Sequence, residues 1–311
     1  MNIETIEETF SCPDNPQVNL SNIRGSVTIQ ASEEGMISVK AHKHLNTGDV
    51  ENTLVELDQT DDGIVVIRTR YDYKGFRFFQ KWVPCKVDYE IQVPEKCSLK
   101  VHGVSSSASI AGIKGTQDIS SVSGDVNLQD LAGELRIKVV SGDVFGEKLS
   151  GIGRLETVSG DITISKSNIS KISGKTVSGD LTIESLMGDG PHDFNSVSGD
   201  IRLFLPRGRG VTISSSSLSG SIRNSLTSSQ SSHTRNKHRI QIEGGGIEIN
   251  HNSVSGDIFL IGENNYGTSP AEEDHLLVEG PAQSVSAILE QINRGELSVD
   301  QAVEMLASES G

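Results

Sequence analysis

Six aspartates recur through the middle of this 311-residue chain, each inside the same short phrase: an apolar residue, Ser, Gly, Asp and a second apolar residue. They are Asp125, Asp143, Asp161, Asp180, Asp200 and Asp257. Regularly spaced carboxylates could do two kinds of chemistry, because paired carboxylates hydrolyse glycosidic bonds and clustered carboxylates bind divalent cations. The phrase therefore suggests, as one alternative, a solenoid that binds or processes polysaccharide or metal through a stacked Asp column.

Other residues add little to that chemistry. Repetition alone produces the Asp column, and no second residue type accompanies it at fixed spacing. His42 and His44 fall on one face of an expected strand, but two ligands without a third partner are more typical of a solvated surface pair than of a zinc site. No Gly-x-Ser-x-Gly nucleophile elbow occurs. We expect no enzyme, and no catalytic, cofactor-binding or metal-binding residues.

The spacing of the phrase predicts the fold. A seventh copy, Leu218-Ser219-Gly220-Ser221-Ile222, has Ser in the Asp place, and the successive intervals are 18, 18, 19, 20, 21 and 36 residues. We interpret the last interval as two periods of 18. Apolar residues within one period alternate as in strands, and so short a unit must stack on its neighbours to bury them.

Coils of a β-solenoid and antiparallel hairpins of a meander both fit this pattern. We favour the solenoid, because identical phrases at a constant period superpose in a coil. The predicted fold is all-β: a right-handed, single-stranded β-helix-like solenoid of roughly 18–20-residue coils, with a small C-terminal helical hairpin.

The phrase itself has a structural interpretation. Its Gly either takes positive φ at a corner or keeps the inner face small, and its flanking apolar residues are expected to be buried. Asp and Ser then point outward. Repulsion between stacked carboxylates, about 1 kcal/mol per neighbour in water, is tolerable if backbone N–H groups or Ser hydroxyls donate to them.

The chain divides into four expected regions. Residues 1–103 are an N-terminal β region that caps the solenoid, and residues 104–261 form the repeat solenoid. Between Ser221 and Ser255 a polar segment is expected to protrude as a loop. Residues 262–283 read as an acidic linker, and residues 284–308 as a helical hairpin, with apolar residues at helical spacing around Gly295.

One segment departs from the aliphatic composition, since six of the chain's aromatic residues alternate with basic ones between Arg68 and Lys86. The aromatic residues are Tyr71, Tyr73, Phe76, Phe78, Phe79 and Trp82, and the basic residues are Arg68, Arg70, Lys74, Arg77, Lys81 and Lys86. This strip could plug the end of the solenoid, or it could contact an anionic lipid surface or an anionic ligand.

Charge and cysteine content limit the function further. The formal net charge of −15 argues against nucleic-acid binding, which needs a basic face. Cys12, Cys85 and Cys97 lack metal-ligand spacing; Cys85 and Cys97 could pair, although a reducing compartment is the simpler explanation. The acidic start of the sequence does not resemble a signal peptide. We expect a cytoplasmic protein that could also bind peripherally to the membrane.

Several stretches resemble a bacterial adhesin-type β-solenoid family. They are the Ser-Gly-Asp ladder, the lead-in Val87-Asp88-Tyr89-Glu90-Ile91-Gln92-Val93-Pro94, and Gly244-Gly245-Gly246-Ile247-Glu248-Ile249 before the last phrase. The likeness covers roughly residues 15–261, and the tail from Ile288 to Leu306 looks like the short helical module called SHOCT-like. The resemblance implies a right-handed solenoid, no established catalytic residues and a link to the cell envelope.

Together these features predict a non-catalytic structural or interaction scaffold, adhesin-like and associated with the envelope or membrane. A hairpin as short as residues 284–308 cannot cover its own apolar stripes, so it needs a partner. We expect a homo-oligomer through these residues, with an anionic membrane surface or an envelope protein as a further partner and no cofactor.

Overall fold

The computed structural model describes residues 2–33, 35–72, 83–206, 208–226, 228–234 and 237–262, and these residues form strands, turns and bends with no helix. Accordingly, this part of the chain contains no helix that is long and apolar enough to cross a bilayer. The expected linker at 262–283, apart from its first residue, and the helical hairpin at 284–308 lie outside the described residues. The chain forms two compact units, residues 1–149 and residues 150–311.

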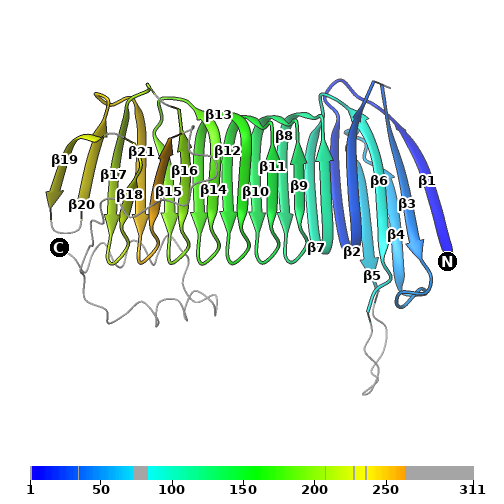
Figure 1. Cartoon of the computed structure of the whole chain (residues 1–311). Helices are drawn as coiled ribbons and strands as arrows, with labels where there is room; N and C mark the ends of the chain where they lie inside the picture. The colour runs from blue at the N-terminus through cyan, green and yellow to red at the C-terminus, as the bar shows by residue number, and fades with distance from the viewer. Residues whose placement is uncertain are drawn as a thin grey trace, which may run out of the picture. The chain divides into compact units, whose positions relative to one another are not determined.

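The first unit contains eleven strands among its described residues (Figure 1). They are β1 (Ile3–Ser11), β2 (Gln17–Ser32), β3 (Met36–His44), β4 (Thr53–Gln59), β5 (Val65–Tyr71), β6 (Val87–Pro94), β7 (Ser98–Ala111), β8 (Lys114–Ser121), β9 (Val126–Gln129), β10 (Ala132–Val139) and β11 (Val144–Glu147).

Parallel pairing at one period identifies the coils. In β9 and β11, Val126 pairs with Val144, 18 residues later, while β8 pairs in parallel with β10. Each coil therefore consists of a longer strand, the Ser-Gly-Asp corner and a short strand. This register confirms the stacked coil and excludes the antiparallel meander for the repeats.

The N-terminal strands lie at the end of this unit. Strand β2 lies along β7 in parallel over almost its whole length, because Val18 pairs with Leu99 and Ile29 with Ile110. The direction then changes: β3 pairs antiparallel with both β6 and β1, and β4 pairs antiparallel with β5. The edge strand β1 carries Glu4, Glu7 and Glu8, and charged side chains discourage further strand addition there.

The second unit also contains eleven strands within the described ranges. They are β12 (Ser150–Thr157), β13 (Ile162–Thr176), β14 (Leu181–Met187), β15 (His192–Ser196), β16 (Ile201–Leu205), β17 (Val211–Ser217), β18 (Ile222–Asn224), β19 (Ser228–Thr234), β20 (Lys237–Ile242), β21 (Ile247–Ser253) and β22 (Ile258–Gly262).

The coils of this unit do not follow chain order. Strand β21 lies between β15 and β17, and β22 lies between β16 and β18, in all cases with parallel register. The last coil is thus inserted between the two coils that precede it in the sequence. The interval of 36 residues before Asp257 is therefore not two consecutive periods, and that prediction was wrong.

The segment expected to protrude as a loop forms a hairpin instead. Strands β19 and β20 pair antiparallel, and β20 continues antiparallel along β17 from Ile242 opposite Val211 to Lys237 opposite Ser216. The physical reason is that β17 otherwise presents an open row of backbone groups on the side away from β21. The hairpin satisfies that edge.

The core is aliphatic, with Val, Ile and Leu as its main residues. The residue after each phrase Asp, such as Val126, Ile162 and Leu181, is fully buried. The residue before the phrase Ser is not buried in four copies: Val122 and Val140 are 41% and 39% exposed, and Val158 and Leu218 are half-buried. The expectation that both flanking residues are buried therefore fails in these copies, because the chain already bends at the corner and turns these side chains outward.

Candidate functional site

The phrase aspartates, our first candidates for chemistry, serve the stacking of coils. The Oδ1 atom of Asp161 accepts a hydrogen bond at 2.8 Å from the backbone N–H of Asp180, and Asp180 accepts in the same way from Asp200 at 2.9 Å. In the first unit Asp125 accepts from the N–H of Asp143 at 3.1 Å. Each carboxylate thus binds the backbone of the next coil, as the sequence analysis required for a stable column.

The Ser and the Gly of the phrase also serve the stacking of coils. The hydroxyl of Ser178 donates to the carbonyl of Val158 at 3.1 Å, so the Ser binds the preceding coil. A Cβ atom on Gly179 would lie 2.0 Å from the carbonyl oxygen of Gly160. The corner glycines do not adopt positive φ; Gly is required because adjacent backbones approach closely.

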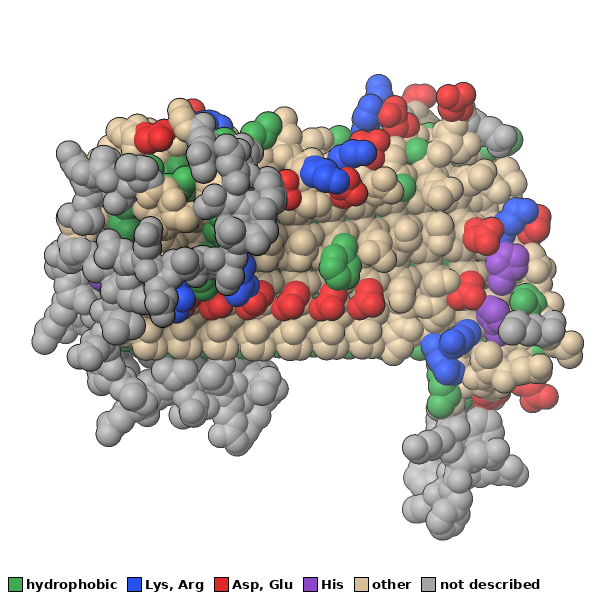
Figure 2. All heavy atoms as spheres, in the orientation of Figure 1, with side chains coloured by type: hydrophobic (Ala, Val, Ile, Leu, Met, Phe, Trp, Pro, Cys, Tyr) green, Lys and Arg blue, Asp and Glu red, His purple; other side chains and the backbone are tan. Residues whose placement is uncertain are grey.

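Arginines neutralise part of the Asp row in the second unit (Figure 2). Arg202 lies 2.6 Å from Asp180 and 3.2 Å from Asp200, and Arg223 lies 3.3 Å from Asp257. Both guanidinium groups stack on the ring of Phe259, at 5.0 and 5.3 Å from its centroid. The row is therefore a set of ion pairs and backbone hydrogen bonds.

Asp200, in the middle of the row of the second unit, has a shifted pKa. Burial raises the pKa of its carboxyl above the ordinary value, and the neighbouring charges of Asp180 and Asp257 act in the same direction. The N–H of Asp257 and the charge of Arg202 oppose this rise. A raised pKa here follows from stacking and does not by itself indicate an acid catalyst.

His42 and His44 lie on the outer face of β3 but belong to two separate contacts. The Nε2 atom of His44 is 2.6 Å from Asp88, whereas His42 contacts the hydroxyl of Thr5 at 3.1 Å and Glu90 at 3.9 Å. Within the described ranges no group of three His, Cys, Asp or Glu side chains could hold a metal ion. The two histidines are not brought together as a pair of ligands.

Most of the aromatic and basic strip, residues 73–82, lies outside the described residues. At its start, Arg70 forms ion pairs with Glu56 at 3.0 Å and Asp72 at 2.8 Å, and Arg68 lies 3.9 Å from Glu56. At its end, Lys86 lines a pocket. Of the three basic residues of the strip that the structure describes, Arg68 and Arg70 are thus paired with acidic side chains, and Lys86 lies apart from them at the pocket.

The three cysteines are unpaired. Burial raises the pKa of Cys97 to about 12, with the nearby thiol of Cys12 adding to the rise. The sequence left a pairing of Cys85 with Cys97 open, and the structure does not contain it. Because the thiolate is the reactive form, the raised pKa makes Cys97 a poor nucleophile.

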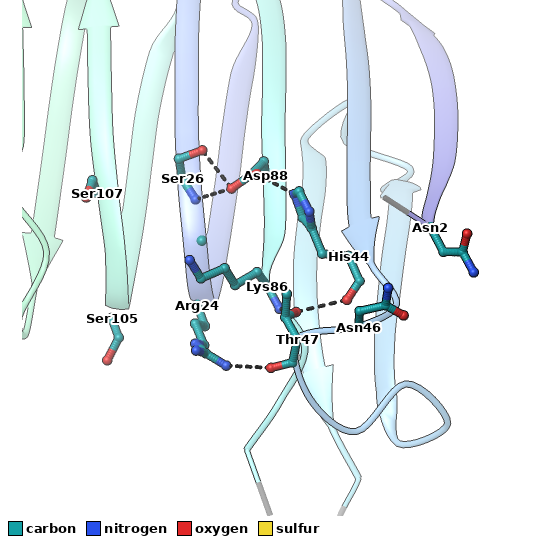
Figure 3. A pocket seen from close by; sticks show the side chains of 11 residues that line it. Asn2, Arg24, Ser26, His44, Asn46, Thr47, Lys86, Asp88, Ser105 and Ser107 are labelled. Carbon is teal, nitrogen blue, oxygen red and sulfur yellow. Dashed lines mark hydrogen bonds and ion pairs between the residues drawn. The ribbon is translucent and has the colours of Figure 1, made fainter.

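A pocket of about 700 Å³ opens on the first unit, where β2, β7 and the residues before β6 meet the turn after β3 (Figure 3). It is lined by Asn2, Arg24, Gly25, Ser26, His44, Asn46, Thr47, Lys86, Asp88, Ser105 and Ser107. Sequence analysis did not find this site. Its signal was a worn copy of the phrase, Ile23-Arg24-Gly25-Ser26-Val27, in which Arg replaces Ser and Ser replaces Asp.

Hydrogen bonds fix the polar groups of this pocket. Nη1 of Arg24 donates to the carbonyl oxygens of Thr47 at 2.8 Å and of Pro84 at 3.4 Å. Asp88 accepts at Oδ1 from the N–H and the hydroxyl of Ser26, both at 2.8 Å, and contacts His44 through Oδ2. Burial raises the pKa of Asp88, but its hydrogen bonds with Ser26 and His44 outweigh burial and lower the pKa below the ordinary value.

The sequence profile of the family described as Toastrack DUF4097 matches residues 17–260, well over half of the chain. The chain belongs to the Toastrack family. The β-rich coils described above are consistent with this assignment. The expected resemblance to an adhesin-like β-fold family is confirmed. Among curated proteins no match is found.

Solved structures similar to this chain include three from Parabacteroides and Bacteroides species. One, from Parabacteroides distasonis and described as a candidate lipid-binding protein, is 16% identical, covers 84% of this chain and 97% of its own, and has a TM-score of 0.54. A candidate adhesin from Parabacteroides merdae is 10% identical, with 83% and 96% covered and a TM-score of 0.49. A candidate adhesin from Bacteroides fragilis is 13% identical, with 83% and 97% covered and a TM-score of 0.46. At 16% identity the likeness to the first of these structures concerns the fold alone.

Proposed function

We propose that this Toastrack protein is a non-catalytic interaction scaffold. The observation that carries the proposal is the use of the phrase in stacking: Asp161 and Asp180 each bind the N–H of the next coil, and Ser178 binds the preceding one. Residues committed to the backbone are poorly placed to bind substrate or to transfer protons. A rigid repeat presents a long surface to an extended partner.

The scaffold works in the cytoplasm, in contact with an anionic membrane surface or an envelope protein, and assembles through residues 284–308. The basic and aromatic composition between Arg68 and Lys86 and the helical spacing of the tail support these parts of the proposal. Lys and Arg near an anionic bilayer contribute about 1 kcal/mol each to binding. The net charge of −15 limits such contact to local basic segments.

The alternative function is a solenoid that binds or processes polysaccharide or metal through the same carboxylates. Substitution of one of these carboxylates tests it. Calorimetry of the full chain with CaCl₂, and reducing-end release from an acidic polysaccharide, are measured for the native protein and for Asp180→Asn. We expect neither saturable Ca²⁺ binding nor product release from either protein. Saturable binding or hydrolysis that disappears in Asp180→Asn contradicts the scaffold proposal.

A further inference from the structure

We propose that the pocket of the first unit binds a phosphorylated polyol, either a lipid headgroup such as phosphatidylglycerol or a soluble glycerophosphate. At the pocket the stacking phrase is altered: Ser stands in the Asp place in two strands, Arg and Lys stand in the Ser place in two strands, and Asp88 keeps its Asp place. This site does not depend on the scaffold role, because phosphate binding and the absence of catalysis are separate properties.

Strand register shows which residues replace the phrase. Ser107 immediately precedes Ala108, which pairs with Val126, so Ser107 takes the place that Asp125 has in the next coil. Ser26 pairs with Ser107, so two successive coils carry a hydroxyl where the column otherwise has a carboxylate. Ser26 and Ser107 therefore offer no carboxylate to the backbone of the next coil, although the N–H of Ser26 still donates to Asp88 at 2.8 Å. Departures from a stacking rule of this kind are expected at binding sites.

At the position of the phrase Ser, basic residues replace the neutral hydroxyl. Arg24 pairs with Ser105, which stands one coil before Ser123 and contacts its hydroxyl at 3.3 Å. Lys86 stands two residues before Asp88, as a phrase Ser stands two residues before its Asp. The coil position that is a neutral Ser elsewhere is thus Arg in one strand and Lys in the next.

The two cations have no carboxylate of their own among the described residues. Arg24 donates to two backbone carbonyls, and neither Arg24 nor Lys86 forms an ion pair. The carboxylate of Asp88, which lines the same pocket, is already bound by Ser26 and His44. A local excess of positive charge on a protein of net charge −15 indicates a site for an anion.

The volume of the pocket and the polar residues that line it indicate which class of ligand it binds. An Arg guanidinium with free donors and a neighbouring Lys suit a phosphate group, which accepts several charge-assisted hydrogen bonds. A volume of about 700 Å³ is much larger than a single phosphate and lies in the range of small-ligand sites. Ser105, Ser107 and Asn46 offer hydroxyl and amide groups around the cations. These groups match the hydroxyls of a polyol.

Two substitutions test the site without removing a packed residue. Ser107→Asp restores the column carboxylate on an exposed side chain, and Lys86→Gln removes one exposed cation. Ser109→Asp adds the same charge two residues further along the outer face of β7 and is the matched control. The midpoint temperature of thermal unfolding of the full chain should be the same or higher in Ser107→Asp than in the native protein, because the restored carboxylate can again accept a backbone N–H.

Binding is measured by calorimetry with sn-glycerol 3-phosphate, with glycerol as the neutral control, and by co-sedimentation with phosphatidylglycerol or phosphatidylcholine vesicles at low salt. We expect binding to glycerophosphate or to phosphatidylglycerol, at least about tenfold weaker in Ser107→Asp and Lys86→Gln and little changed in Ser109→Asp. Binding to glycerophosphate identifies a soluble ligand, and binding to vesicles alone identifies the headgroup. No binding in either assay, or binding equally affected by all three substitutions or by none, overturns the proposal.

Discussion

The Oδ1 atom of Asp257 accepts a hydrogen bond at 2.8 Å from the backbone N–H of Ser221, a residue 36 positions earlier in the chain. Asp257 itself donates its N–H to Asp200 at 3.0 Å. The ladder of the second unit therefore runs through Asp161, Asp180, Asp200, Asp257 and Ser221 in that order. Ser221 ends this ladder within the described residues, because no further phrase N–H follows it. The copy of the second unit that has Ser in the Asp place is therefore the copy that needs no acceptor.

The close approach of corner backbones predicts a sharp difference between two glycines of the second unit. Gly179→Ala would place a methyl group 2.0 Å from the carbonyl of Gly160, whereas in Gly153→Ala the nearest atom, on the side chain of Ile169, is 3.5 Å away. We expect Gly179→Ala to lower the free energy of unfolding by at least about 2 kcal/mol and Gly153→Ala by much less. Urea denaturation measures both.

A buried histidine predicts a specific acid sensitivity of the second unit. Burial lowers the pKa of His251 to about 4, and its Nδ1 contacts the hydroxyl of Ser215 at 2.9 Å. The unfolded chain takes up a proton near pH 6.5 and the folded chain only near pH 4, so stability is full above pH 6.5 and declines as the pH falls between these values. The decline amounts to roughly 3 kcal/mol at most.

Urea denaturation across this pH window, on the native chain and on His251→Leu with Ser215→Ala, isolates the effect. The double substitution removes the titrating ring and the hydroxyl that would otherwise lose its partner. The native chain should lose more stability than the variant between pH 7 and pH 4. Identical pH profiles would show that His251 is not held neutral by burial.

The helical spacing of the tail predicts assembly. Each expected helix has one apolar stripe that a 25-residue hairpin cannot fully cover, so a second copy should bury the remainder. Light scattering should give an oligomer for the full chain and a monomer for a version that ends at Gly280. Equal monomeric masses would refute tail-driven assembly, and an oligomer that survives truncation would place the interface elsewhere.

The repeat made most of the architecture predictable. A constant period with one phrase leads to parallel coils, and the pairing of Val126 with Val144 confirms it. The sequence did not predict the order of the last coils, because the interval before Asp257 equals two periods. Ser221 marks the last coil of the stack, but this can be recognised only when it is known that each Asp accepts the N–H of the next coil.

The pocket was harder to predict than the coils. Arg24 and Ser26 lie in a recognisable worn phrase, but Lys86 and Asp88 reach them through a parallel pairing of β2 with β6 that spans about 60 residues. Nothing periodic marks that pairing, because the intervening strands β3 and β4 pair antiparallel with their neighbours. Long-range register of this kind is fixed by side-chain burial across the whole end of the unit.

The central claim, that the Asp column holds the coils together through hydrogen bonds to the backbone, is tested most directly at Asp125, whose Oδ1 atom accepts from the N–H of Asp143 at 3.1 Å. Asp125→Asn keeps an oxygen acceptor without the charge, and Asp125→Ala removes both. We expect urea denaturation to show a loss of about 1 kcal/mol in the free energy of unfolding for Asp125→Ala and a clearly smaller loss for Asp125→Asn. Equal losses for Asn and Ala would mean that the charge itself is what the site needs, and would contradict the account.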